Sequence, residues 1–358
     1  MTPTPLVLDT DIGTDVDDAL ALAFVLASPE LDLVGVTIVD GDVDVRARIA
    51  ARLLGMAGRP DIPVIRGAST PNGAGRGPTW FGHESRGLLE LDWDGPEATI
   101  LDATAAEWLV ETSRTQPFHL AAVGPFTNVA NAVLLDPTLV ERVPKLTVMG
   151  GMAHPESYDD QWRQFFAETG LPPNHMDHNT ASDVDAALTV ARAGFEMTWV
   201  TAELTFCTTL DRDAIGQFRS TGTVFGDRLA NMTEIWASEF FHHIPNFPET
   251  ARPFPERAVA ALHDPLAIAS IFGGEWLILR DHDLRFAHEG ERFGMYETDG
   301  PEAEATHRCS TAVDRHAFNT FFRDRLMAWM HTMRLPTMPT GTPIHEQLQT
   351  EDNDEEHT

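Results

Sequence analysis

The chain has 358 residues, which is enough to bury one large core or two smaller ones. Its formal net charge is −30, from 55 acidic and 25 basic side chains, and so acidic a surface argues against a nucleic-acid partner or an anionic membrane. Its only cysteines, Cys207 and Cys309, provide neither a disulfide framework nor a thiolate zinc site, and without a visible signal peptide or membrane span we expect a cytoplasmic protein.

The first half of the chain alternates short apolar runs with helical patterns. Residues 6–8 predict a buried strand, and residues 19–26 predict a buried helix that ends before Pro29. Residues 68–99, rich in glycine, proline and charge, predict a long loop near a site. The other expected elements are strands at 31–39, 62–67 and 118–123 and helices at 43–56, 101–114 (with Asp102 as its cap) and 129–135. Alternation at this spacing indicates βαβ units and a parallel sheet.

The second half of the chain is less regular. Residues 154–178 form a polar stretch without a clear period, and residues 258–272 predict a helix. The other expected elements are strands at 145–149 and 197–201, helices at 181–193, 211–219, 224–243 and 313–333, and a late strand pair at 284–287 and 292–296. We therefore expect one α/β domain over residues 1–335, built on an open, mainly parallel sheet flanked by helices. An extension over residues 336–358 is expected to end in a disordered acidic tail.

Aspartates are concentrated directly after the first expected strand, at positions Asp9, Asp11, Asp15, Asp17 and Asp18. The carboxyl ends of strands are where open α/β sheets build their sites. One or two aspartates there would need no role beyond capping the following helix. So many carboxylates cannot sit close together and stay ionised without a cation, and oxygen ligands suit a hard cation such as Ca²⁺ or Mg²⁺. The cluster therefore predicts a metal site.

Two further motifs could complete such a site. His263, Asp264 and Pro265 could simply cap a helix, but a carboxylate beside a histidine also suits a metal ligand next to a general acid. The segment from Gly124 to Asn128 is a strand-to-helix turn that could also bring a main-chain carbonyl to the cation.

Two other motifs could contact an organic ligand. Asp177 and Asn179, two residues apart, could face a polyol together or lie in an ordinary surface loop. His242 and His243 follow an aromatic run that is equally consistent with core packing and with a wall that stacks on a base beside a proton donor.

Taken together, these motifs resemble the nucleoside hydrolase family, often called inosine–uridine preferring. The opening signature stands here as Asp9-Thr10-Asp11-Ile12-Gly13 followed by Asp17-Asp18-Ala19. The resemblance covers roughly residues 5 to 272 and continues in order through Gly41, Gly124-Pro125-Phe126-Thr127-Asn128, Met149-Gly150-Gly151, Asn179 and His263-Asp264-Pro265.

The resemblance implies an open α/β fold with a Rossmann-like core and a tightly bound Ca²⁺ at the strand ends. It implies hydrolysis of the N-glycosidic bond of purine or pyrimidine ribonucleosides to ribose and free base, as in nucleoside salvage. It also implies a homo-oligomer, either a dimer or a tetramer.

The resemblance assigns roles residue by residue. Carboxylates of Asp11, Asp18 and Asp264 and the main-chain carbonyl of Val123 would bind Ca²⁺. Asp11 would also be the general base, and Asp17 and Asn179 would hold the ribose hydroxyls. His263 would be the proton donor to the leaving base, with His242 and His243 as further candidates.

The chain departs from the family pattern at several positions. Two residues are inserted before the paired aspartates, so Asp15 is additional and could compete as a ligand. Asp42 replaces the usual Asn after Gly41, and Asp177 replaces the usual Glu before the ribose-binding Asn. Asn174 is a possible substitute for an upstream Asn, and His83 stands in a reversed Gly-His order. We count Asp42, Asn174, Asp177 and His83 as candidate substrate contacts.

Two rival functions remain open on the sequence alone. A haloacid-dehalogenase-like phosphatase would use Asp9 as its nucleophile, but Lys145, the single lysine, lies at the start of a strand. A riboside- or calcium-binding protein without hydrolase activity would keep the same aspartates. An EF-hand would need Glu at the twelfth position from Asp9, which is Leu20 here.

Overall fold

The computed structural model describes residues 2–241 and 254–333. Its main sheet has ten strands in the order β11-β10-β12-β7-β6-β5-β1-β2-β3-β4, and β8 pairs with β9 in a separate two-stranded sheet. The strands are β1 (Thr4–Thr10), β2 (Leu31–Ile38), β3 (Val64–Arg66), β4 (Ile100–Leu101), β5 (His119–Ala122), β6 (Lys145–Met149), β7 (Glu196–Val200), β8 (Thr209–Asp211), β9 (Ala258–Ala261), β10 (Leu277–His288), β11 (Phe293–Glu297) and β12 (Ala305–Val313).

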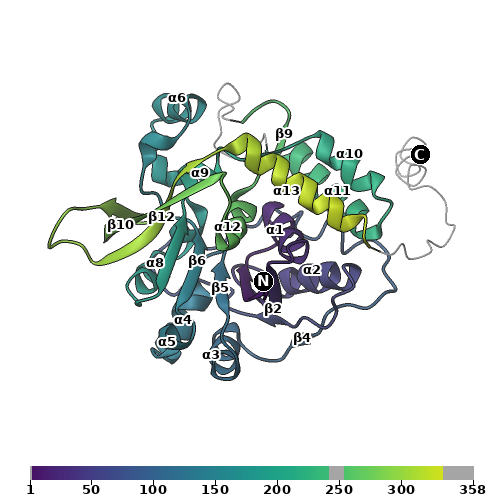
Figure 1. The fold of residues 1–358 in the computed structure, drawn as a ribbon, viewed down its shortest axis with the longest axis horizontal. Coiled ribbons are helices and arrows are strands. Elements are labelled where there is room, and N and C mark those ends of the chain that lie inside the picture. Colours follow the sequence, from purple (N-terminus) through teal and green to yellow (C-terminus); the bar gives the residue numbers. More distant parts are fainter. Residues whose placement is uncertain (1, 242–253, 334–358) are drawn as a thin grey trace, which may run out of the picture.

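Helices cover both faces of the main sheet (Figure 1). They are α1 (Asp17–Leu26), α2 (Val43–Met56), α3 (Ala105–Thr115), α4 (Thr127–Leu135), α5 (Leu139–Arg142), α6 (Asp160–Thr169), α7 (His178–Ser182), α8 (Val184–Ala191), α9 (Ala202–Thr205), α10 (Asp213–Ser220), α11 (Val224–Ile235), α12 (His263–Phe272) and α13 (Arg315–Met330). Shorter turns are η1 (Pro155–Ser157), η2 (Pro173–Met176) and the π-helical η3 (Trp236–Phe241). Within the described residues, no helix has the length and apolar character needed to cross a membrane.

The apolar residues of β1 divide between the two faces of the sheet. Leu6 and Leu8 belong to a core with α1, α2, α12 and α13, whereas Val7 belongs to a core with α3, α4 and α8. Successive strand residues point to opposite faces, so a nearly continuous apolar strand needs helices on both sides. In the main sheet, all neighbours from β12 to β4 pair in parallel, whereas β10 pairs antiparallel with β11 and with β12. The expected open, mainly parallel sheet flanked by helices is confirmed.

The strand order creates a crevice between β1 and β5. From β1 the chain adds β2, β3 and β4 on one side, and it then returns to add β5, β6 and β7 on the other. At such a reversal the loops that leave the two central strands diverge, and open α/β sheets bind ligands there. The loops that follow β1, β5 and β6 therefore lie at one edge of the sheet.

Several expected elements differ from the observed ones. Residues 258–261 are strand β9 rather than helix, because they pair antiparallel with β8, a partner distant in sequence. The polar stretch 154–178 contains α6, whose buried Trp162, Phe165 and Phe166 lie on one face. Thr104, not Asp102, caps α3 in a capping box with Glu107. The end of the helix expected at 224–243 and the extension over 336–358 lie outside the described residues.

Candidate active site

Three buried carboxylates converge where two helices begin. Asp17 and Asp18 lie in the first turn of α1, and Asp264 lies in the first turn of α12, which packs against α1. One oxygen of each carboxylate lies within 4.8 Å of the other two. The main-chain N–H of Asp264 also donates to Oδ2 of Asp17 (3.1 Å). The partial positive charge at the two helix N-termini offsets only part of this negative charge.

The carboxylates are too close and too buried to remain ionised on their own. Burial raises the pKa of Asp17, Asp18 and Asp264 well above the usual range, and neighbouring carboxylates raise it further. Burial and then the charge of Asp18 raise the pKa of Asp15, in the loop before α1, to about 7. Oδ1 of Asp15 is buried without a hydrogen-bond partner among the described residues. An oxygen-only donor set of this kind fits a hard divalent cation.

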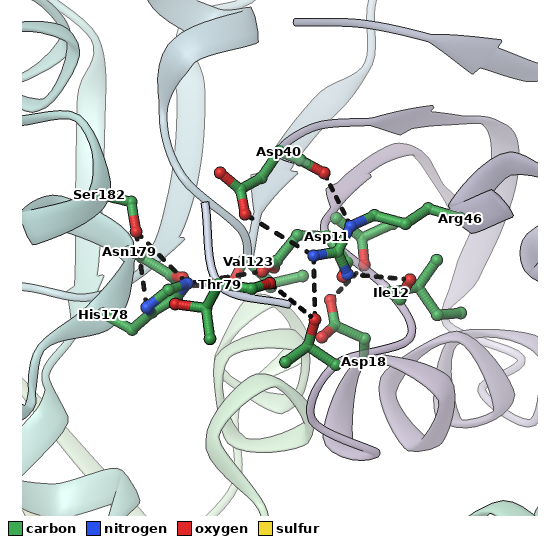
Figure 2. A network of polar contacts seen from close by, with 12 residues as sticks. Asp11, Ile12, Asp18, Asp40, Arg46, Thr79, Val123, His178, Asn179 and Ser182 are labelled. Atoms are coloured by element: carbon green, nitrogen blue, oxygen red, sulfur yellow. Dashed lines mark hydrogen bonds and ion pairs between the residues drawn. The ribbon is translucent and has the colours of Figure 1, made fainter. Parts of the chain in front are cut away.

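Arg46, on α2, is a buried cation beside this cluster. Its Nε donates to the main-chain carbonyl of Asp40 (2.7 Å), and its guanidinium lies 3.6 Å from the Asp40 carboxylate. It also donates to the carbonyls of Asp11 and Ile12, which shapes the loop after β1 (Figure 2). Its charge lowers the pKa of Asp18, but less than burial and the charges of Asp11 and Asp17 raise it.

Asp11, the first residue after β1, points toward a second polar group. Its Oδ2 lies 3.8 Å from Nε2 of His178, and one oxygen of Asp40 joins this pair within 4.8 Å (Figure 2). A Cβ on Gly124 would lie 2.7 Å from Oδ1 of Asp11, so only glycine allows the turn after β5 to approach this closely. The strand-end turns of β1 and β5 are thus fitted to each other.

A contact between Val123 and Asn179 joins the loops that follow β5 and β6. The side-chain amide of Asn179 donates to the main-chain carbonyl of Val123 (Figure 2). It also donates to the main-chain carbonyl of Met149 (3.1 Å). The N–H of Val123 donates to the carbonyl of Asp9 (2.8 Å), which joins the end of β5 to β1. The structure therefore brings the loops after β1, β5 and β6 together.

A cavity of about 390 Å³ connects these groups. Aspartates form its acidic lining: Asp11, Asp15, Asp17, Asp18 and Asp264. Aromatic side chains form much of its remaining wall: Phe81, Phe165, Phe206, Trp236, Phe241 and Phe254. Acidic side chains suit a hydroxyl-rich ligand, and aromatic faces suit a planar ring.

His263 lines the same cavity but is held neutral. Burial lowers its pKa to about 3, and its Nδ1 lies 2.7 Å from Oγ1 of Thr205. That hydroxyl also lies within hydrogen-bond distance of the carbonyl of Ala202 (3.1 Å). If the hydroxyl donates to Ala202, it accepts from Nδ1–H, and Nε2 of His263 then carries a lone pair and no proton. The free protein therefore does not hold an imidazolium here near neutral pH.

Asp42 and Asp177, two of the expected substrate contacts, instead form hydrogen bonds within the protein. Asp42 is exposed and caps α2 by accepting from the N–H of Val45 (3.0 Å). Asp177 is buried, but its carboxylate accepts from the N–H of Gly151 (2.9 Å) and from Thr180. Neither side chain lines the cavity.

Two other candidates, His83 and Asn174, do not line the cavity. Nε2 of His83 lies 2.9 Å from the main-chain carbonyl of Thr14, and its ring stacks between Phe81 and Trp236, which do line the cavity. Asn174 lies in η2 next to His175, a lining residue. His242 falls outside the described residues, as does His243.

Sequence reasoning missed several residues of the site. His178 stood between two candidates and was given no role, although its ring faces Asp11. Arg46 had a usable signal, because it precedes Ile49 by three positions and so lies on the buried face of its helix. Asp40 adopts a left-handed conformation (φ 71°) at the end of β2. Arg76 comes from the long loop 68–99 and lines the cavity.

Comparisons with known proteins point to the same family that the sequence motifs resemble. The family model described as inosine-uridine preferring nucleoside hydrolase matches residues 6–320. A probable uridine nucleosidase 2 of Arabidopsis thaliana is 28% identical over 273 residues, which cover 75% of this chain and 77% of that protein. The pyrimidine-specific ribonucleoside hydrolase RihA of Salmonella arizonae is 28% identical over 332 residues, which cover 90% and 98%.

Solved structures share the fold. A plant nucleoside hydrolase superposes with a TM-score of 0.73 at 23% identity and covers 91% of this chain and 99% of its own. A purine-preferring ribonucleoside hydrolase from Gardnerella vaginalis superposes with a TM-score of 0.72 at 22% identity, covering 92% and 100%. At these identities the superpositions show only that the fold is shared. The family assignment rests on the family model, which matches nearly the whole sequence. The chain therefore belongs to the inosine-uridine preferring nucleoside hydrolase family and is a nucleoside hydrolase.

Proposed function

We propose that this protein hydrolyses the N-glycosidic bond of purine or pyrimidine ribonucleosides and that it uses Ca²⁺ to do so. The observation that carries the proposal is the lining of the cavity, which combines five aspartates with six aromatic rings. A ribonucleoside has the same two parts, a ring with vicinal hydroxyls and a planar base. The family membership of the chain supports the same chemistry.

In this proposal the acidic residues hold the cation and the ribose. Asp18 and Asp264 bind the cation through their carboxylates, and Val123 binds it through its main-chain carbonyl. A bound Ca²⁺ would hold a water molecule and lower its pKa. Asp17 belongs to the same group of oxygens and could bind either the cation or a ribose hydroxyl. Asn179, beside Val123, would hold another ribose hydroxyl.

Asp11 would accept the proton of the attacking water. It lies in the cavity next to His178 and near Asp17 and Asp18, whose pKa values its charge helps to raise. Cleavage of an N-glycosidic bond develops positive charge on the sugar, as in other glycoside hydrolyses. The surrounding carboxylates would stabilise that charge while the bond to the base breaks.

The leaving base would depart toward the aromatic wall. His263 lines the cavity and is the family-matched candidate for a contact with the base, but burial lowers its pKa to about 3. It would therefore act as a neutral imidazole, by hydrogen bonding, rather than as a stored acid. Trp236, Phe206 and Phe241 offer ring faces that could stack on the base.

The direct test is the release of reducing sugar from a panel of purine and pyrimidine ribonucleosides. We expect hydrolysis of at least one ribonucleoside, loss of the activity in chelator and recovery on addition of Ca²⁺. Binding of ribonucleosides without release of sugar from any of them would contradict the proposal and would favour a riboside-binding protein. Activity that survives complete removal of divalent cations would contradict the role of Ca²⁺ alone.

The same panel tests the ribose pose through 2′-deoxyribonucleosides. We expect these substrates to be cleaved at least about tenfold more slowly, because the site loses one hydrogen-bonded hydroxyl and leaves buried polar groups unpaired. The ratio of kcat/KM for a ribonucleoside and its 2′-deoxy analogue measures the effect. Equal values would show that the 2′-hydroxyl is not bound.

Asp42 provides a contrast to the cavity aspartates. Replacing it with alanine should lower the free energy of unfolding by about 1 kcal/mol, because the N-cap hydrogen bond to Val45 is lost. We expect kcat/KM to be unchanged, since the side chain is exposed and does not line the cavity. Urea denaturation and steady-state kinetics on one ribonucleoside check both halves. A large loss of kcat/KM at unchanged stability would restore Asp42 as a substrate contact.

A further inference from the structure

A second group of metal-binding side chains lies away from the acidic cavity. His154 follows β6 and precedes η1, His282 lies within β10, and Glu297 is the last residue of β11. One ligand atom from each lies within 4.8 Å of the others, and the centroids of the two imidazole rings are 5.0 Å apart. None of the three lines the cavity that holds the aspartates.

In both histidines, Nδ1 lies next to a glutamate carboxylate. Nδ1 of His282 lies 2.9 Å from Oε1 of Glu297, and Nδ1 of His154 lies 3.4 Å from Oε1 of Glu156. A carboxylate on Nδ1 fixes the tautomer and the ring orientation, as it does for histidines that bind metals through the opposite nitrogen.

The opposite nitrogens, Nε2 of both rings, have no hydrogen-bond partner in the described part of the chain. Nε2 of His154 and Nε2 of His282 are both buried, and neither has a hydrogen-bond partner among the residues that the structure describes. The side chain of His282 is only 10% exposed. Leaving two such nitrogens buried and unpaired costs free energy unless something binds them. Imidazole nitrogens that are each backed by a carboxylate on Nδ1 are typical ligands of a divalent transition metal.

We propose that His154 and His282 bind a divalent transition metal ion of the Zn²⁺ type through their imidazoles, at a site separate from the carboxylate cluster, with Glu297 orienting the ring of His282. Imidazole nitrogen favours such an ion over Ca²⁺, which prefers ligands that are all oxygen. Glu297 is about half exposed, so water can complete the coordination. Both imidazoles bind through Nε2, while Glu156 lies on Nδ1 of His154 and Glu297 lies on Nδ1 of His282.

The site joins two parts of the fold. His154 begins the segment from 154 to 178, and that segment carries Phe165, His175 and Met176 into the lining of the active-site cavity. His282 and Glu297 belong to the antiparallel β10–β11 pair at the edge of the main sheet. A metal ion between them fixes this cavity wall to the sheet, so its role is structural.

The test uses the full, untagged chain, because an affinity tag of histidines would itself bind the ion. Excess Ca²⁺ is added first to occupy the carboxylate cluster, and Co²⁺ is then titrated as a spectroscopic probe, with Zn²⁺ followed by calorimetry. We expect one equivalent to bind with the visible absorption of nitrogen-ligated Co²⁺. His154→Ala and His282→Ala should each weaken binding by at least about tenfold, whereas His316→Ala, on the exposed side of α13, should not change it.

Thermal unfolding tests metal binding independently of the titrations. Zn²⁺ in the presence of Ca²⁺ should raise the Tm of the wild type and of His316→Ala, and it should not raise the Tm of the two cluster variants. If His282→Ala does not fold, Glu297→Gln serves in its place, since its side chain is about half exposed. Wild-type protein that binds no Co²⁺ in excess Ca²⁺ overturns the proposal, as does unchanged affinity in both histidine variants.

The outcome is separable from the proposed hydrolase activity. With Ca²⁺ and no Zn²⁺, the histidine variants should hydrolyse ribonucleosides at the wild-type rate, because His154, His282 and Glu297 do not line the cavity. If Ca²⁺ does not occupy the carboxylate cluster, a second equivalent of Co²⁺ will bind and will persist in the histidine variants. Failure of the calcium site and failure of the histidine site therefore give different results.

Discussion

Replacing Asp11 with alanine is expected to reduce kcat/KM for every ribonucleoside that the protein cleaves by about 10²- to 10⁴-fold, the usual contribution of a positioned general base. Asp11 lies in the cavity at the end of β1, and its Oδ2 is 3.8 Å from His178. No other acidic side chain in the cavity shares that contact, so we expect little compensation. Steady-state kinetics on the best substrate of the panel measures the loss.

The stability of the variant separates a chemical role from a folding defect. Asp11 adds negative charge that raises the pKa of Asp17, Asp18 and Asp264, so removing it should not destabilise the metal-free protein. Calorimetric titration with Ca²⁺ shows whether Asp11 is also a ligand, because loss of a ligand lowers the affinity and loss of the base alone does not. Asp42→Ala is the matched control. Full activity in Asp11→Ala with Ca²⁺ bound would remove Asp11 from the mechanism.

The stabilisation that Ca²⁺ provides is expected to grow as the pH rises from about 5 to about 8. In the metal-free protein, the raised pKa values of Asp15, Asp17, Asp18 and Asp264 mean that the folded state retains protons there. These protons stabilise the metal-free fold at low pH, and that stability is lost as the pH rises through the folded-state pKa values. A cation must displace the protons, and each one displaced adds about 1.4 kcal/mol per pH unit to the stabilisation.

His119 and His307 change the absolute stability but not this difference. Burial lowers the pKa of His119 and of His307 to about 4, so both favour folding as the pH rises toward the ordinary histidine range. They contribute equally with and without the cation, because neither belongs to the cavity. Urea denaturation midpoints at several pH values, in chelator and in a fixed excess of Ca²⁺, isolate the effect. A difference between the two curves that does not change with pH would show that the carboxylates are not protonated in the metal-free protein.

Local patterns in the sequence predicted the parts of the fold that depend on neighbouring residues. Helix α2 and strand β6 have the expected bounds. The spacing of apolar residues and the residues that end each element lie within the segment itself, so no distant partner is needed to predict them. The late pair of β10 with β11 was also expected and is confirmed. Strand β9 was not, because residues 258–261 are apolar and short, and only their pairing with β8 makes them a strand. Helix α6 was hidden because polar residues surround its three buried aromatic side chains.

The same division applies to the candidate site. Asp11, Asp17, Asp18, Val123, Asn179, His263 and Asp264 were named from their motifs, and all of them line one cavity. Asp42 was named from the same kind of pattern, yet it caps a helix at the surface. A sequence motif predicts which residue types lie near the end of a strand. It does not predict where each side chain points, because that direction depends on the conformation of the surrounding loop.

By itself, the sequence indicated the family, the mainly parallel sheet and a cluster of aspartates suited to a cation, because these follow from residue order and from local charge. Only the tertiary structure decided which side chains meet. It brings Asp264 within 4.8 Å of Asp17 and Asp18, although more than half the chain separates them, and it sets Asp11 against His178. It also brings His154 to His282 across the edge of the sheet. The reason is that strand order and helix packing, which no single segment encodes, set the distances between residues far apart in sequence.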